Sequence, residues 1–532
     1  MNPDLRASTR TAFTFLMALA MGGLAAVAFS SQAHAQSTVS NLNDSGPGSL
    51  RQAIADVAPG GVIDFDVSGT IALESELVID KDLTIEGNMP ITVSGNESVR
   101  VFFISDGTVT LDRLTIADGL AVSDEDRDCD NRECGGGIVI DNAGVDLTVK
   151  NSLITNNQTS QWGGGIANMA GNLTLVNTTV SSNTSRYPPA GLFNVGGGIR
   201  VLGGTTTLIN STITDNFAFN NGGGIAVGGS ANLIVNGVII AGNHIDSGSN
   251  DCNVSSTIAT VSGSHNFLGV AGCEFPGSGD PLLEELADNG GVTRTHALLP
   301  GSPAIGGADN DICADSDTVD NGDQRGIPRP QGDACDIGAF ESRGFTMNLV
   351  SGDGQATMVG TDFPHLLAVD VTSEFDEPVD GGEVTFIAPD SGASLSDEVS
   401  FASINDGLAN LLPTANAVAG DYTVTAKLSG SDDDVGFGLT NLPQTFEVTA
   451  SVASGMGEID PNLQVVEAGD TASFSIEPET GWSVESVSGD TCSPTLVAGN
   501  DWEAADIQDD CHVEASFRLN EVFRDRFEEE VP

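Results

Sequence analysis

The sequence predicts an all-β protein whose longer, N-terminal part is a parallel β-helix, followed by two small β domains. Gly-Gly-Gly-Ile occurs four times, starting at Gly135, Gly163, Gly196 and Gly222. An asparagine follows each copy after 16, 14, 14 and 14 residues, at Asn151, Asn177, Asn210 and Asn236. Apolar residues alternate with polar ones in the same units, as in Leu147-Thr-Val149, which indicates short strands. A basic repeat of 26 residues without a helical pattern fits one winding of a solenoid.

In a solenoid, equivalent residues of successive windings lie above one another, about 4.8 Å apart. We therefore expect one inward-pointing column of isoleucines, made of Ile138, Ile166, Ile199 and Ile225. The repeated asparagines are expected at turns, where their amides form a hydrogen-bonded ladder. A β-sandwich with Gly and Asn in its hairpins is the alternative, but it does not explain the constant steps.

Two short helices are predicted as covers for the open strand edges of the solenoid. Ser49-Leu50-Arg51-Gln52 is a capping box, and it opens an apolar stripe that reaches Val57. A second helix is expected to begin at Asp280-Pro281 and to stop at Gly290.

The length of the chain indicates the number of domains, and its net charge excludes some classes of partner. The 532 residues predict about three domains. The chain has 75 acidic and 19 basic side chains, a net charge of -56. Such a field repels nucleic acid and anionic lipid, so a nucleic-acid partner is excluded.

The first 35 residues predict an export signal. Arg6 and Arg10 precede an apolar stretch at 12–29, and Ala33-His34-Ala35 has the form of a cleavage site. No later stretch approaches the ~20 apolar residues that span a bilayer. We expect a secreted or cell-surface protein with no membrane span once the signal is removed.

The even number of cysteines in an exported chain favours disulfides. The eight cysteines form four pairs of near neighbours: Cys129/Cys134, Cys252/Cys273, Cys313/Cys335 and Cys492/Cys511. A zinc site is the alternative, but the chain has no Cys-x-x-Cys pair.

Several motifs resemble known families. Asp44-Ser-Gly-Pro-Gly-Ser-Leu-Arg-Gln-Ala53 resembles the start of bacterial exported right-handed parallel β-helix proteins, and the Gly-Gly-Gly-Ile units resemble polymorphic outer-membrane-protein repeats. Thr295-His-Ala-Leu, Asp323-Gln-Arg-Gly and Cys335-Asp-Ile-Gly-Ala-Phe-Glu resemble the end of the choice-of-anchor Q domain. The resemblance covers about 37–343 and implies a right-handed β-helix exported to the surface of a bacterium, but no established reaction. The end of the chain, Val522-Phe-Arg-Asp-Arg-Phe-Glu, resembles the short ends of exported proteins of some Gram-negative bacteria, which is the expected source.

Different patterns predict the remaining boundaries. Strands at sandwich-like spacing over 344–447, such as Asp421-Tyr-Thr-Val-Thr-Ala, resemble invasin-type bacterial Ig-like domains. The segment 448–518 resembles an internalin B-repeat module, a small β fold. The solenoid with its caps is then 36–343, and 519–532 is an acidic amphiphilic tail.

The β-helix fold serves lyases, hydrolases and adhesins, so fold does not decide between them. A lyase needs an unpaired arginine or lysine, and only Arg200 lies where a groove base is expected; an ion pair on the acidic surface is the favoured interpretation of it. No catalytic or cofactor residue is predicted. Calcium is a minor alternative at the acid-rich loops of 309–323 and 124–130.

The repeat arithmetic also predicts a recognition edge. Insertions at 120–134 and 184–195 both precede a glycine triplet, so both belong to the same corner of the solenoid. The residues expected along this edge are Asp126, Arg127, Arg132, Trp162, Tyr187, Phe193, Phe217 and Phe219. Its expected partner is a cell-surface glycan or protein, and the alternative is that the aromatic rings only cover the glycines. The sequence thus favours adhesion or an envelope-structural role, with a carbohydrate-active β-helix enzyme, lyase or hydrolase, as the alternative.

Overall fold

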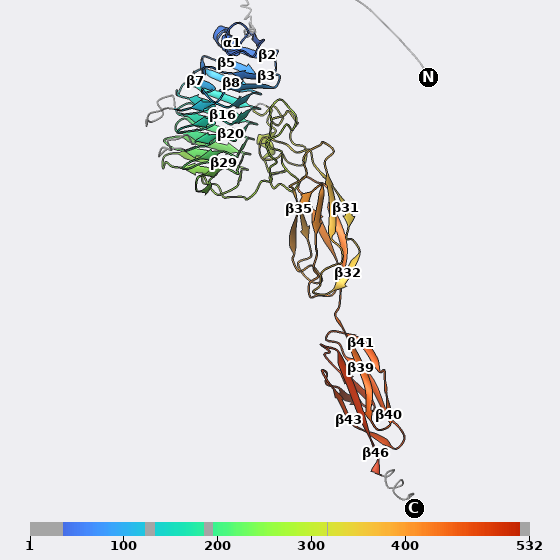
Figure 1. The fold of residues 1–532 in the computed structure, drawn as a ribbon. Helices are drawn as coiled ribbons and strands as arrows, with labels where there is room; N and C mark the ends of the chain where they lie inside the picture. Colours follow the sequence, from blue (N-terminus) through green and yellow to red (C-terminus); the bar gives the residue numbers. More distant parts are fainter. Residues whose placement is uncertain (1–35, 123–133, 186–194, 317, 522–532) are drawn as a thin grey trace, which may run out of the picture.

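The computed structural model describes residues 36–122, 134–185, 195–316 and 318–521. Its N-terminal part is a right-handed parallel β-helix whose windings lie one above another and form four sheets, here A to D; their strands are parallel except for one antiparallel pair at the end of sheet D (Figure 1). Sheet A contains β1 (Gln36–Val39), β2 (Gly61–Phe65), β5 (Leu83–Glu86), β8 (Thr108–Asp112), β12 (Asp146–Lys150), β16 (Asn172–Val176), β20 (Thr205–Ile209), β24 (Asn232–Asn236) and β29 (Thr260–Ser264).

The other three sheets follow in each winding. Sheet B contains β3 (Gly69–Ala72), β6 (Ile91–Ser94), β9 (Thr115–Ala117), β13 (Leu153–Thr155), β17 (Thr179–Ser181), β21 (Thr212–Thr214), β25 (Ile239–Ala241) and β30 (Phe267–Leu268). Sheet D contains β10 (Leu120–Ala121), β14 (Gln158–Thr159), β18 (Thr184–Ser185), β22 (Phe217–Ala218), β26 (His244–Ile245) and β27 (Gly248–Ser249). Sheet C contains β4 (Leu77–Asp80), β7 (Phe102–Asp106), β11 (Ile138–Ile140), β15 (Ile166–Asn168), β19 (Ile199–Val201), β23 (Ile225–Val227) and β28 (Cys252–Val254).

The predicted isoleucine column is confirmed. Ile138 pairs in register with Ile166, Ile166 with Ile199, and Ile199 with Ile225. All four side chains are fully buried in the apolar core of the solenoid. The core forms because alternate residues of every strand point inward and meet their counterparts one winding away.

The main asparagine ladder lies at a different position from the predicted one. Asn177 does donate to the Asn151 side chain, at 3.4 Å, but Asn236 is a strand residue, and Gly237 takes the left-handed turn position. The buried ladder runs through Asn157, Asn183, Asn216 and Asn243, with amide-to-amide distances of 2.9, 3.0 and 2.9 Å. The ladder ends at Asp251, whose carboxylate accepts from the Asn243 side-chain amide at 3.0 Å. A carboxylate has no N–H of its own, so it needs no acceptor in a further winding.

The two predicted helical covers have different outcomes. Helix α1 (Leu50–Asp56) is present, and the Ser49 hydroxyl accepts the Gln52 N–H at its N-terminus. The helix predicted from Asp280 is wrong: Leu282 has φ 51°, and Leu283 and Ala287 make antiparallel bridges to 298 and 295. Pairing with the later segment is favoured over a helix because it packs the partly buried Leu283 against an apolar cluster that includes Ile239 of the solenoid.

Residues 280–343, here called the plug, cover the outer face of sheet B instead of the end of the solenoid. Gln324 accepts from the Thr179 hydroxyl at 2.7 Å, and His296 bonds the Ser181 hydroxyl at 2.9 Å. Within the plug lie α2 (Asn310–Cys313) and two buried ion pairs, Arg325–Asp323 at 2.7 Å and Arg329–Glu341 at 2.9 Å. The residues that resemble the choice-of-anchor Q motif therefore hold this loop-rich segment together.

Two mainly antiparallel β domains follow the plug (Figure 1). The first contains β31 (Thr346–Ser351), β32 (Gln355–Met358), β33 (Leu367–Thr372), β34 (Glu383–Ile387), β35 (Val399–Asn405), β36 (Leu408–Leu411), β37 (Gly420–Lys427) and β38 (Val435–Leu442). The second contains β39 (Thr445–Ser454), β40 (Gly457–Asp460), β41 (Leu463–Glu467), β42 (Ala472–Pro478), β43 (Trp482–Gly489), β44 (Thr495–Ala498), β45 (Asp501–Ala504) and β46 (Cys511–Leu519). Each has its own apolar core.

Three predicted disulfides are confirmed: Cys252–Cys273, Cys313–Cys335 and Cys492–Cys511. Cys134 is also disulfide-bonded, and Cys129 lies outside the described residues. The export signal and the end of the tail lie outside them as well. In the described ranges, no helix has the length and apolar character that a bilayer crossing requires.

Candidate active site on the outer face of sheet C

The middle of the outer face of sheet C is covered, although outward-facing residues of a solenoid usually contact water. One outward column runs through Val78, Phe103, Val139, Ala167, Arg200, Ala226 and Asn253. Val78 is 48% exposed, whereas Val139 and Ala167 are at most 1% exposed. Trp162 packs on these two residues, because it enters the winding just before the glycine turn that precedes Ile166.

Arg200 is the charged member of this column and is only 7% exposed. Its guanidinium carbon lies 5.5 Å from the centre of the Trp162 ring. The neighbours along the column, Ala167 and Ala226, are small, and Gly228 leaves the space that the guanidinium fills: a Cβ there would lie 2.4 Å from its Nη2. Small residues on three sides thus make room for one large cation.

The ion pair predicted for Arg200 is wrong. The other arginines with buried side chains in the described ranges are paired: Arg100 with Glu76 at 2.7 Å, Arg325 with Asp323 at 2.7 Å and Arg329 with Glu341 at 2.9 Å. No carboxylate of the described residues lies within 4.0 Å of Arg200, and its Nε is buried with no hydrogen-bond partner. Burial lowers the pKa of Arg200 to about 10, since no carboxylate compensates for the lost hydration.

A buried, unpaired guanidinium is unfavourable for folding. Removing an ion from water costs several kcal/mol in a protein, and a desolvated cation–π contact returns only about 2 kcal/mol. Arrangements of this kind concentrate at functional sites, where a substrate or ligand supplies the missing interaction.

The predicted recognition edge is described only in part. Asp126, Arg127, Arg132, Tyr187 and Phe193 lie outside the described residues. Both insertions lie between the same two columns of paired residues. The column before them consists of Ala121, Thr159, Ser185 and Ala218. The column after them consists of Cys134, Trp162, Val195 and Asn221. Phe217 belongs to β22 in sheet D, and Phe219 follows that strand. In this winding the residue equivalent to Trp162 is Asn221, four residues after Phe217.

The acidic loops make no evident cation site in the described ranges, where no three acidic, histidine or cysteine groups converge. Asp309 and Asp323 instead accept backbone N–H groups, and Asp320 pairs with Lys150 at 3.1 Å. The loop around Cys129 lies outside the described residues, so calcium stays a prediction.

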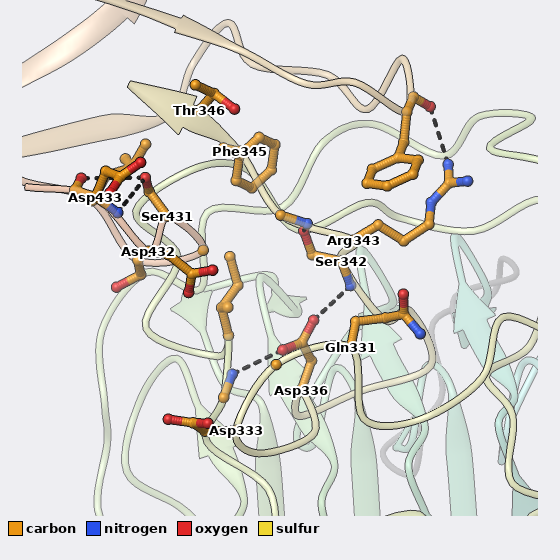
Figure 2. Close-up of a pocket in the computed structure, with 18 of the residues that line it drawn as sticks. Gln331, Asp333, Asp336, Ser342, Arg343, Phe345, Thr346, Ser431, Asp432 and Asp433 are labelled. Atoms are coloured by element: carbon orange, nitrogen blue, oxygen red, sulfur yellow. Dashed lines mark hydrogen bonds between the residues drawn. The ribbon is translucent and has the colours of Figure 1, made fainter. Parts of the chain in front are cut away.

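A second concave region, about 520 Å³ in volume, lies between the plug and the first C-terminal domain. Figure 2 shows its acidic lining, with Asp336 accepting the Ser342 N–H, at 2.6 Å, and Arg343 beside it. Burial, together with the nearby Glu341 charge, raises the pKa of Asp336 to about 8. Arg343 pairs with Glu377 at 3.2 Å, so the polar groups here join the two parts of the chain.

Comparison with known proteins gives partial matches. No protein-family model matches the chain. It is 37% identical over 97 residues to probable pectate lyase C of Aspergillus flavus and of Aspergillus oryzae. The match covers 15% of this chain and 23% of each relative, so the chain spans less than a quarter of their length.

Two solved structures are also similar in part. The pectate lyase Pel9A has a TM-score of 0.31 at 15% identity, covering 57% of this chain and 96% of that one. The bacterial integrin-binding protein invasin has a TM-score of 0.17 at 15% identity, covering 31% and 33%. The resemblances to the choice-of-anchor Q, Ig-like and internalin families stay predictions.

Sequence reasoning placed Arg200 correctly on a winding but missed its environment. The signal was present in the repeat: the residues equivalent to Arg200 in neighbouring windings are alanines, at 167 and 226. A single arginine in a column of small residues is a departure from the pattern, and its contact with Trp162 required the structure because the two lie on successive windings.

Proposed function

We propose that this chain is an exported polysaccharide lyase of the β-helix type that acts on a uronate-containing polysaccharide at Arg200. The unpaired, buried guanidinium of Arg200 on Trp162 is the observation that carries the proposal. The local similarity to pectate lyases supports the substrate class, since pectate is a polymer of uronic acid. The predicted export signal and the disulfides support action outside the cell.

The chemistry is a β-elimination. A base removes the proton at C5 of the uronate, the C4–C5 double bond forms, and the C4–O bond breaks, while the departing oxygen takes a proton from water. The base must be unpaired and within reach of the sugar. Arg200 fits this role because burial lowers its pKa to about 10, which makes its neutral form far more accessible than that of an ordinary arginine.

The test is to incubate the full chain with polygalacturonate, with and without calcium, and to follow the ultraviolet absorbance of the unsaturated product. We expect product with the native chain and none with Arg200→Met. Arg518→Met is the matched control, because Arg518 is an exposed arginine of β46, far along the chain from the solenoid. Equal rates for native and Arg200→Met chains would refute the assignment.

A second candidate is recognition without cleavage, as in adhesion. The charged form of Arg200, stacked on Trp162, is suited to hold a carboxylate. Binding of polygalacturonate that depends on Arg200, with no unsaturated product, would favour this candidate over the lyase.

A further inference from the structure

The outer face of sheet A carries a regular array of polar side chains, in which one column includes five successive threonines. One column holds Thr84, Thr110, Thr148, Thr174 and Thr207, on five successive strands. A second column, two residues earlier on each strand, consists of Thr108, Asp146, Asn172, Thr205, Asn232 and Thr260. Both columns lie on the part of sheet A that the plug leaves open, and the sheet faces the viewer in Figure 1; the next column along the strands is partly covered, with Val176 buried and Lys150 paired with Asp320 of the plug.

The array has fixed spacings in two directions. From β5 to β29 the strands pair in register without a bulge, so the threonines repeat every ~4.8 Å along the solenoid. The two columns are two residues apart along each strand, about 6.6 Å. A β-branched side chain on a strand is stiff at χ1, so each methyl and hydroxyl pair is held in place.

The five hydroxyls of the threonine column make no hydrogen bond to another group of the described protein. All five side chains are half-buried by their neighbours, with their outer surface open. They are therefore free to bond water or a ligand that has the same repeat.

The threonine column is also uncharged over eight strands, since Val62 precedes the five threonines and Ile234 and Ser262 follow them. In a chain of net charge -56, so long an uncharged column favours a neutral ligand, although Asp146 stands in the second column and Glu86, Asp112 and Lys150 in the column on the other side. Neither column contains an aromatic residue, which argues against a sugar chain held by ring stacking.

We propose that this face of sheet A binds ice. The surface of hexagonal ice presents rows of water oxygens whose repeat is close to the ~4.8 Å spacing of the threonine column. The hydroxyls of the threonine column anchor the first water layer by hydrogen bonds, and their methyl groups order it. A rigid array loses little entropy when the lattice forms on it.

Ice recrystallisation in the presence of the full chain tests the proposal, with binding of the dye-labelled chain to an ice crystal as a second measurement. We expect inhibition and surface labelling with the native chain, and their loss in Thr148→Tyr/Thr174→Tyr, whose rings break the lattice match. Thr372→Tyr, at an exposed threonine of β33, is the matched control and keeps both. Should the tyrosine pair not fold, Thr148→Lys/Thr174→Lys serves instead.

Native chain that neither inhibits recrystallisation nor labels ice overturns the proposal, as does full activity in the folded double variant. The inference is independent of the proposed lyase activity, because sheets A and C are different faces of the solenoid. Arg200→Met is expected to retain full ice binding.

Discussion

The Arg200 guanidinium lies 5.5 Å from the centre of the Trp162 ring, with no carboxylate of the described chain within 4.0 Å. The two residues belong to successive windings, so the stacking of the windings brings them into contact. In a chain with 75 acidic residues, a buried cation without a carboxylate partner is an exception, and it costs stability.

We therefore predict that Arg200→Met stabilises the protein while removing its activity. Replacing an uncompensated buried charge by an apolar side chain of similar length is expected to raise the free energy of unfolding by about 1–3 kcal/mol. Urea unfolding followed by circular dichroism measures this change. A destabilised Arg200→Met would show that the cation–π contact outweighs the desolvation.

The rate of cleavage is predicted to rise with pH up to about 10, the pKa of Arg200. Only the neutral guanidine accepts a proton, and its fraction increases about tenfold per pH unit below the pKa. Initial rates across the pH range test this. Polygalacturonate binding through the charged guanidinium has the opposite pH dependence, because its affinity falls as pH rises above about 10. A cleavage rate that does not change with pH would argue against Arg200 as the base.

Salt is predicted to lower the KM for polygalacturonate. The chain and the substrate are both anionic, and raising ionic strength from about 0.01 to 0.15 M shortens the Debye length from about 30 to 8 Å. The contact with Arg200 is screened less because it is buried. Assays in sodium chloride with a chelator separate this effect from calcium, and a KM that rises with salt would contradict it.

Arg329→Met is predicted to destabilise the plug, in contrast to Arg200→Met. Arg329 and Glu341 are at most 1% exposed at their side chains and 2.9 Å apart, so the variant leaves a buried carboxylate without its partner. The expected loss is about 3–5 kcal/mol. The comparison of the two variants in one unfolding series distinguishes a paired from an unpaired buried arginine.

Asn183→Ala is predicted to cost about 2–4 kcal/mol, since it removes the acceptor of the buried Asn157 backbone N–H and of one side-chain N–H, and the side-chain donor to the Ile154 carbonyl. Asn172→Ala, at an exposed strand position, is the control and is expected to change stability by less than about 0.5 kcal/mol. Equal stability of the two variants would mean that water replaces the ladder.

The solenoid could be predicted from the repeat alone, because a repeat of fixed length brings equivalent residues into register. The column of Ile138 and its counterparts and the helix after Ser49 both follow from local spacing and capping. The same regularity contains the threonine array of sheet A, since Thr110, Thr148 and Thr174 recur at fixed places in the repeat.

The positions of the irregular segments depend on contacts between residues that are distant in the chain. The plug covers the side of sheet B because Gln324 and His296 find partners on Thr179 and Ser181, more than a hundred residues earlier. The isolation of Arg200 likewise depends on which carboxylates come near it in space. Local patterns specify conformation, whereas these contacts join segments whose spacing along the chain carries no periodic signal.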